Sequence, residues 1–424
     1  MPTKHYLDRL LNSHYAWAAV FFVFIILTNR WLDWYSAIDF LTAHDADSYL
    51  AIAKAAPGLP EYGITYYYGQ RFFSSWVVGC VSQFTGIEFE KTFFLFVVLC
   101  FLGIAYVLLS YFKILKLPLK WAMVLFCLYF LNPYTTRYYL LIPGLLEDVV
   151  YTLGLSIVTL GMVKDSRSLM LGGFALSILG RQTALMALPG FLLWHWVVKD
   201  RFRFALICTA LVICLYQWTS WVALSFAQGK TNNLWHIFAL FGWLASERFS
   251  LIELLEFTLR LALPFLFCGA IFFGFATKSY SFSSHPVKKL FNAIRLAIDA
   301  LWLVLVKRRR ENWVLFLALV LMGLGPSLQP FLSSPWLTGR NAGRLSSLGL
   351  VAVVMALGFY LSQIRNVKAQ GRRSFWIFFP IVFGSFHHMF SIIGPPSASL
   401  FALGQFIMMV LIFLLVRAES KIAK

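Results

Sequence analysis

The feature that most constrains this chain is the repetition of long apolar blocks along almost its whole length. A helix needs about 20 mostly apolar residues to cross the hydrocarbon core of a bilayer, and blocks of that size recur between short basic or aromatic segments. Composition agrees: 60% of the 424 residues are hydrophobic and 13% are charged, whereas a soluble domain is about 25% charged. We therefore expect an all-α polytopic membrane protein. A soluble enzyme, a secreted disulfide scaffold and a disordered protein are excluded.

The apolar blocks predict about twelve transmembrane helices, within a range of about 11–13, in a single domain over residues 1–424. The fifth helix is short, and the boundary between the fifth and the sixth falls at Gly180-Arg181-Gln182. The expected spans are 11–29, 92–112, 120–138, 146–163, 168–181, 183–198, 204–226, 252–276, 312–330, 345–363, 375–393 and 399–416.

The basic residues give the chain a formal net charge of +18. Clustered Lys and Arg suit nucleic acid, but here they lie mainly in connections between apolar blocks, where positive charge marks the cytoplasmic side of a membrane. This placement predicts that both termini are cytoplasmic and that nucleic acid is not a partner. The cysteines lie mostly inside apolar stretches without metal-ligand spacing, so we expect them to be core residues.

Two connections are too long for simple turns. The inner one, 277–311, has basic clusters at both ends of an apolar stretch, which predicts a helix in the cytoplasmic interface against anionic lipid. The outer one, 30–91, is the first extracytoplasmic loop and is rich in acids and aromatic residues. Long loops in compact proteins are usually functional or disordered, and the aromatic content favours order with amphipathic surface helices.

The outer loop offers two acids for chemistry, Asp45 and Asp47. One of them opens an expected surface helix, where the simplest role is an N-cap for the first turn. The alternative is a carboxylate that faces a cleft as a general base or as a cation ligand. If 45–49 is helical, a spacing of four places Asp45 and Tyr49 on one face while Asp47 points away.

The same stretch carries a family resemblance. One span followed by a long outer loop with Asp45-Ala46-Asp47-Ser48-Tyr49-Leu50-Ala51-Ile52-Ala53 resembles the GT-C superfamily of integral-membrane glycosyltransferases. Tyr67-Tyr68 with Arg71, and later Gly180-Arg181-Gln182 through Leu188-Pro189, are similar to further parts of that pattern. The chain departs from it in lacking an adjacent acidic pair in the loop and a Pro after Arg71.

The resemblance implies an inverting hexosyl- or pentosyltransferase that acts at the extracytoplasmic face of a membrane, the bacterial inner (plasma) membrane, on a cell envelope glycan. The donor would be a polyprenyl-phosphate-linked sugar and the acceptor a glycan, a lipid or a protein, among membrane lipids. Asp45 would serve as the catalytic base with Asp47 in reserve. Donor sugar and acceptor are not encoded by any motif.

Arginines on the outer side are candidates for binding the phosphate of the donor. Arg340 and Arg344 are four residues apart, so a helix would stack them on one face, and guanidinium groups suit phosphate oxygens. The alternative is interfacial anchoring beside Trp336. Arg181, near the end of an apolar span, is either a third phosphate ligand or a side chain that snorkels to the interface.

Glu147 and Asp148 open the fourth span on the same outer side. They are either favourable charges at a helix N-terminus or, as the GT-C resemblance implies, groups that position acceptor or metal. The same role is considered for Tyr49 and Arg71. These two acids and the two acids of the outer loop could together bind a divalent cation such as Mg or Mn if the fold brings them close. The proposed reaction does not require a cofactor.

Two other functions compete with the transferase. Twelve spans with both termini inside also suit a polytopic transporter or a lipid-linked glycan flippase, although no 6+6 repeat is evident. An O-antigen polymerase or ligase would likewise handle lipid-linked sugars, but it usually carries its large outer loop late in the chain.

Overall fold

A computed structural model describes residues 13–31, 45–61, 63–132, 134–198, 201–229, 233–246, 250–276, 311–333, 342–364, 374–384 and 395–422. Within these ranges the chain is helical and contains no β-strand. The longer elements are α2 (His14–Trp31), α4 (Asp45–Ala55), α6 (Phe72–Thr85), α7 (Phe89–Ile114), α8 (Leu119–Phe130), α10 (Leu146–Lys164), α11 (Arg167–Gly180), α12 (Leu188–Val197), α13 (Phe202–Phe226), α14 (Asn233–Leu244), α15 (Leu251–Ala262), α16 (Leu266–Ala276), α18 (Glu311–Leu332), α21 (Leu350–Ser362), α22 (Ser374–Gly384) and α24 (Pro395–Ile422).

Short helical turns connect several of these. They are α5 (Tyr66–Gly69), α9 (Thr136–Leu141), η1 (Pro143–Leu145), η2 (Gln182–Ala187), η3 (Leu263–Phe265), α20 (Ala342–Ser346) and η6 (Ser347–Gly349).

Six helical stretches of the described chain are long and apolar enough to cross a membrane. They are Phe89–Ile114, Pro143–Lys164, Phe202–Phe226, Leu251–Phe275, Glu311–Leu332 and Ala342–Ser362, and shorter apolar helices lie at His14–Thr28, Leu119–Phe130, Arg167–Gly180 and Leu403–Ala418. The protein is therefore an all-helical membrane protein, as the sequence predicted. Spans beyond these six stay a prediction.

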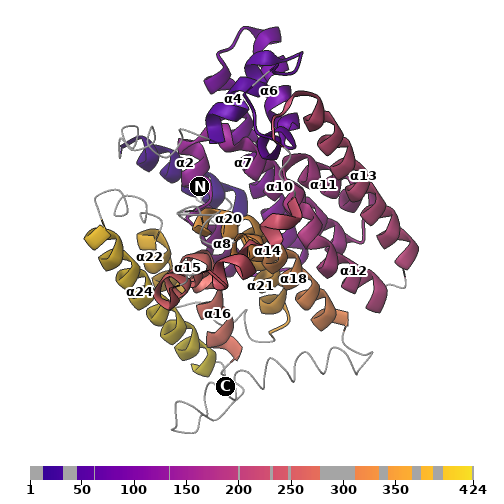
Figure 1. Ribbon diagram of the computed structural model, residues 1–424. Helices are drawn as coiled ribbons and strands as arrows, with labels where there is room; N and C mark the ends of the chain where they lie inside the picture. The colour runs from indigo at the N-terminus through magenta and orange to yellow at the C-terminus, as the bar shows by residue number, and fades with distance from the viewer. Residues whose placement is uncertain are drawn as a thin grey trace, which may run out of the picture.

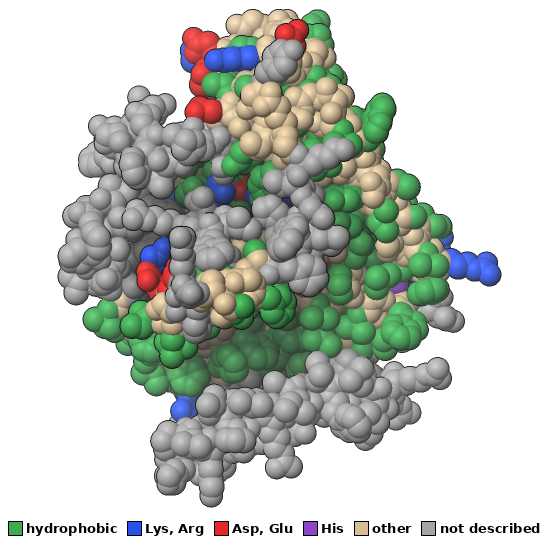
Figure 2. Space-filling model, viewed as in Figure 1, with side chains coloured by type: hydrophobic (Ala, Val, Ile, Leu, Met, Phe, Trp, Pro, Cys, Tyr) green, Lys and Arg blue, Asp and Glu red, His purple; other side chains and the backbone are tan. Residues whose placement is uncertain are grey.

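Large apolar side chains are exposed along several of these helices, among them Tyr106 on α7, Trp221 on α13 and Leu414 on α24. Figure 2 shows hydrophobic side chains over much of the described surface of one face, whereas several acidic and basic side chains gather at the end that carries α4 and α6 in Figure 1. Contiguous apolar surface of this extent is stable against lipid tails and not against water.

The most extensive helix–helix packing is between α10 and α11. A side chain at Gly154, Gly173 or Gly180 would overlap the backbone of the facing helix, so glycine allows the two backbones to approach, as small residues do in membrane helix pairs. Gly180 lies against the backbone of Glu147 and Tyr151 in the first turns of α10. The end of α11 is thereby fixed beside the beginning of α10.

Helices α4 and α6 lie together beyond the bundle, at what we call the α4–α6 end (Figure 1). Gly79 of α6 packs directly on the Ala53 carbonyl of α4. A parallel bridge between Thr65 and Gln228 ties this region to the residues that follow α13. The described part of the loop 30–91 is thus packed helix, while of the basic segment 277–311 the structure describes only Glu311, the first residue of α18.

Candidate functional site

Two adjacent acids, Glu147 and Asp148, lie buried in the first turn of α10. Their exposed fractions are 1% and 3%, and the η1 turn just before them packs against α4. A charge in the interior of a membrane protein is costly unless it is paired or faces a polar cavity. The side chains that surround these two acids therefore define the candidate site, which lies at the α4–α6 end.

Asp148 is held by three side chains from three other segments. One carboxylate oxygen pairs with Nη1 of Arg181, the residue that follows α11. The other oxygen accepts a hydrogen bond of 3.0 Å from the Tyr139 hydroxyl of α9 and lies 4.0 Å from Nε of Arg344 in α20. Asp148 is thus a fixed counter-ion for buried arginines.

Arg71 lies between α5 and α6, with 4% of its surface exposed. Its guanidinium donates to the Gln182 carboxamide oxygen at 3.2 Å and to the Tyr49 hydroxyl at 3.4 Å, and it stacks 3.9 Å from the ring centre of Tyr67. None of the ion pairs among the described residues involves Arg71. A buried guanidinium whose described partners are all neutral favours the binding of an anion.

The phenol of Tyr67 connects the two arginines. Arg71 covers its ring, and Nη2 of Arg181 donates to its hydroxyl at 3.4 Å. Burial alone would raise the pKa of Tyr67, but the positive charges of Arg71 and Arg181 outweigh burial and hold that pKa below its usual value of 10.0. Burial is the main cause at Tyr49, whose pKa is raised, so this phenol stays neutral.

Glu147 has fewer partners than its neighbour. It accepts a hydrogen bond from the Ser75 hydroxyl of α6 through Oε1. Its other oxygen, Oε2, is buried and has no hydrogen-bond partner among the described residues. One of the two buried carboxyl groups therefore keeps an oxygen available.

The surface helix expected from Asp47 onward is present as α4, which begins at Asp45. Tyr49 is buried and Asp47 is exposed, which matches the predicted separation of these two side chains. The Asp45 side chain lies outside the described residues, so its expected position on the Tyr49 face stays a prediction.

The arginine predictions fare differently. Arg181 and Arg344 are buried, with 1% and 6% of their surfaces exposed. Trp336 lies outside the described residues, so anchoring of Arg344 beside it stays a prediction. Both arginines reach the same carboxylate, and the Arg344 guanidinium also lies 5.7 Å from the ring centre of Tyr138. Arg340 lies outside the described residues, and stacking of Arg340 on Arg344 stays a prediction.

Sequence reasoning missed Ser75 and Tyr139, which hold the two carboxyl groups. The only available signal for Ser75 was the pair Ser74-Ser75 in an apolar helix, and for Tyr139 the pair Tyr138-Tyr139 next to Arg137. Neither pattern identifies a partner 72 or 9 residues away.

A metal centre has limited support. The described residues include no group of three or more His, Cys, Asp and Glu side chains that could hold a metal ion. Glu147 and Asp148 face Ser75, Tyr139 and arginines, and guanidinium groups repel a cation. An ion held with Asp45 stays a prediction.

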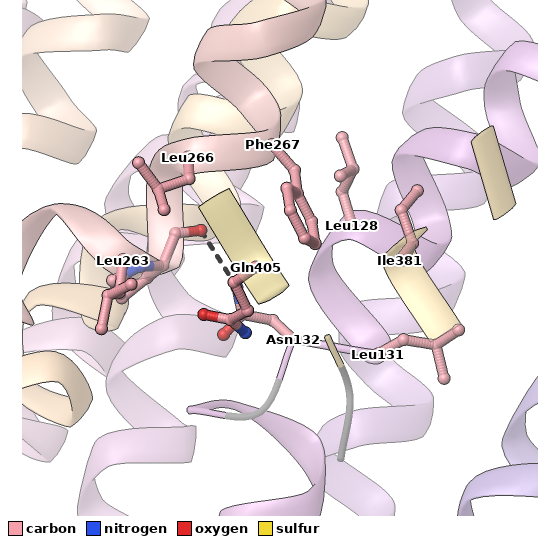
Figure 3. A pocket seen from close by; sticks show the side chains of 9 residues that line it. Leu128, Leu131, Asn132, Leu263, Leu266, Phe267, Ile381 and Gln405 are labelled. Atoms are coloured by element: carbon pink, nitrogen blue, oxygen red, sulfur yellow. Dashed lines mark hydrogen bonds between the residues drawn. The ribbon is translucent and has the colours of Figure 1, made fainter. Parts of the chain in front are cut away.

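A separate, small pocket lies between α8, η3, α16, α22 and α24 and has a volume of about 10 Å³. Figure 3 shows the carboxamides of Asn132 and Gln405 close together at one side of this pocket, with the Phe267 ring nearby. Asn132 donates to the Pro264 carbonyl at 3.0 Å. The remaining lining is aliphatic, and a space of this size has room for about one water molecule.

Comparisons of the chain with protein-family profiles, with curated proteins and with solved structures found no match.

Proposed function

We propose that this protein is an inverting glycosyltransferase that moves a sugar from a polyprenyl-phosphate donor to an acceptor hydroxyl at the extracytoplasmic face of the membrane. The proposal includes about twelve spans with both termini cytoplasmic. It places the reaction at the α4–α6 end, and the resemblance of the segment 45–53 to the GT-C superfamily is its starting point.

The observation that carries the proposal is the buried arginine Arg71 beside Arg181. Three guanidinium groups, counting Arg344, surround two carboxyl groups, so the site favours an added anion even with both acids ionised. Of the substrates of such an enzyme, the donor phosphate is the group that needs this charge. Arg71 therefore joins Arg181 and Arg344 as a phosphate ligand, in place of the acceptor or metal role considered for it from the sequence.

The chemical step follows from these assignments. The acceptor oxygen attacks the anomeric carbon and gives its proton to the Asp45 carboxylate, with Asp47 in reserve. The bond between the anomeric carbon and the phosphate oxygen breaks, and the electron pair leaves with the polyprenyl phosphate. The arginines stabilise the charge that grows on that oxygen, which is where fixed positive groups contribute most to rate.

The test is transfer of a radiolabelled sugar from a panel of polyprenyl-phosphate sugars by the purified protein in lipid nanodiscs. We expect Asp45→Asn to abolish transfer and Arg71→Gln to lower it by about 10²–10³-fold, the loss typical of removing one charge-stabilising group. The matched control is Arg201→Gln, whose exposed pair with Asp165 lies outside this site, and it should keep wild-type activity. Full activity in both Asp45→Asn and Asp47→Asn would refute the mechanism.

A carrier is the second candidate, because a buried ion pair such as Arg181–Asp148 inside membrane helices also occurs along transport paths. Protein in liposomes that moves a lipid-linked glycan between leaflets, but transfers no sugar, would favour a flippase over the enzyme. An O-antigen polymerase or ligase would also handle lipid-linked sugars, and adding diphosphate-linked donors to the same panel tests for it.

A further inference from the structure

The two adjacent carboxyl groups of the site are not equivalent. Asp148 has an ion pair, a hydrogen bond from a phenol and a second guanidinium 4.0 Å away. Glu147 has the Ser75 hydroxyl and a second oxygen that no described residue contacts by a hydrogen bond. A proton that arrives at this site has an available acceptor at Oε2 of Glu147, whereas at Asp148 it would have to displace the arginines.

Glu147 is also electrostatically close to the arginine that favours an anion. Arg71 and Glu147 interact through space, and Tyr49 is within range of both. The charged and titratable groups that interact with Glu147 are Asp148 beside it on α10, Arg71 between α5 and α6, and Tyr49 on α4. A second set of groups lies against the adjacent Asp148: Tyr139 from α9, Arg181 after α11 and Arg344 from α20. Tyr67 contacts Arg71 and Arg181.

An anion bound at Arg71 changes the charge balance around Glu147. With both acids ionised, the three arginines leave the empty site with one unit of excess positive charge. A phosphodiester, which carries one negative charge, balances that excess. A phosphate monoester carries almost two negative charges at neutral pH, so the site becomes negative unless one carboxyl group gains a proton, because like charges in a poorly solvated site disfavour ionisation.

We propose that Glu147 takes up a proton when a phosphate monoester occupies the site beside Arg71. This inference rests on the proposed function, whose products are a monoester and a proton. The acceptor O–H bond breaks, the donor diester becomes a monoester with one more negative charge, and the proton first held by the outer-loop base ends on Oε2 of Glu147. Glu147 is a charge-balancing residue for the product complex and not the base that contacts the acceptor.

The experiment is titration calorimetry of the protein in nanodiscs with hexyl phosphate, a monoester, and with hexyl methyl phosphate, a diester. Measurements run at about pH 9, where a monoester with a second pKa near 6 is a dianion in solution, in two buffers with different enthalpies of ionisation. The difference in heat between the buffers reports the protons taken up. We expect the wild-type protein to take up a proton with hexyl phosphate and not with hexyl methyl phosphate.

Two variants make the assignment specific. Glu147→Gln should bind hexyl phosphate without proton uptake. In the wild type the dissociation constant for hexyl phosphate should change by up to about tenfold per pH unit. In Glu147→Gln this dependence on pH should disappear. The control Glu88→Gln removes an exposed acid paired with Lys91 and should retain the uptake. Ser75→Ala, a milder change, should move the pH range of uptake upward, because the lost hydrogen bond favoured the ionised carboxylate.

The outcomes separate the two proposals. Uptake that persists in Glu147→Gln, or that is absent in the wild type although hexyl phosphate binds, refutes the role of Glu147 while leaving the transferase proposal standing. If neither phosphate binds to the wild-type protein, the anion site itself is refuted and both proposals fail.

Discussion

Arg181, the residue that follows α11, forms a buried ion pair with Asp148 in the first turn of α10. The pair is possible because Gly180 lets the two helices meet at that point. Its side chains are almost fully buried, in contrast to the pair Arg201–Asp165, where about a third of each side chain is exposed.

Arg181→Ala should therefore cost about 3–5 kcal/mol in the free energy of unfolding, because it leaves the Asp148 charge buried with weaker compensation. Arg201→Ala, the matched change at the exposed pair, should cost about 0–1 kcal/mol. Reversible unfolding in mixed micelles measures both. A double variant, Arg181→Met with Asp148→Leu, should recover part of the loss. Equal costs for the two single variants would contradict a structural role for the buried pair.

Tyr67 should ionise below the usual range of a tyrosine, because Arg71 and Arg181 hold its pKa below 10.0. In a pH titration followed by tyrosinate absorbance, the contribution of Tyr67 is the part that the Tyr67→Phe variant lacks. This part should appear at a lower pH than the absorbance of the other tyrosines. Arg71→Gln should move it to a higher pH. The pKa of Tyr67 is lower in the folded protein than in the unfolded chain, where it is about 10. Ionised Tyr67 therefore contributes its full stabilisation above the unfolded pKa. This stabilisation is lost as the pH falls through the pKa of the folded protein. A Tyr67 signal at or above the ordinary pKa would contradict the arrangement.

Gly79→Ala should loosen α4 from α6, because a side chain at Gly79 would overlap the Ala53 carbonyl. We expect faster proteolysis within the α4–α6 end and a loss of about 1–3 kcal/mol, the usual cost of overpacking. Gly172→Ala is the control: a side chain at that helical position meets no atom within 4 Å, so it should be neutral or stabilising by up to about 1 kcal/mol. Similar destabilisation by both would indicate that α4 does not depend on this contact.

Ser220→Ala should weaken the attachment of α5 to α13, because the buried Gln70 side chain donates to the Ser220 hydroxyl at 2.7 Å. Loss of this buried hydrogen bond should cost about 0.5–1.5 kcal/mol, because the Gln70 carboxamide keeps its bond to the Tyr66 hydroxyl at 3.3 Å. Amide exchange over residues 66–71 should accelerate. Ser225→Ala removes a hydroxyl that donates to the Val222 carbonyl within its own helix turn and should leave that exchange unchanged. No acceleration in Ser220→Ala would show that the bridge at Thr65 and Gln228 holds the segment by itself.

Periodic apolar blocks and short polar breaks were enough to predict individual helices. The predicted span 146–163 corresponds to α10 (Leu146–Lys164), the span 204–226 lies within α13 (Phe202–Phe226), and the break at Gly180-Arg181-Gln182 coincides with the end of α11. Such boundaries are local, because hydrophobic length and a charged residue decide them.

The sequence predicted which charged residues belong to the site but not how they pair. Glu147, Asp148, Arg181 and Arg344 were conspicuous as charges next to apolar spans, and an intramembrane charge is a functional candidate by default. Their pairing was not predictable, because it depends on glycine contacts between α10 and α11 and on Ser75 and Tyr139, whose sequence neighbourhoods give no sign of a carboxylate partner.

The bridge between Thr65 and Gln228 has a consequence for how the protein is made. Backbone hydrogen bonds of 3.0 Å and 2.8 Å join Tyr66 and Ile64 to Gln228, and Gln70 reaches Ser220 across 150 residues of sequence. The ribosome synthesises α5 and Arg71 long before α13 exists. The proposed anion site therefore reaches its final form only after α13 has been inserted. A nascent chain truncated before residue 228 should carry Arg71 without the contacts that hold this segment in place.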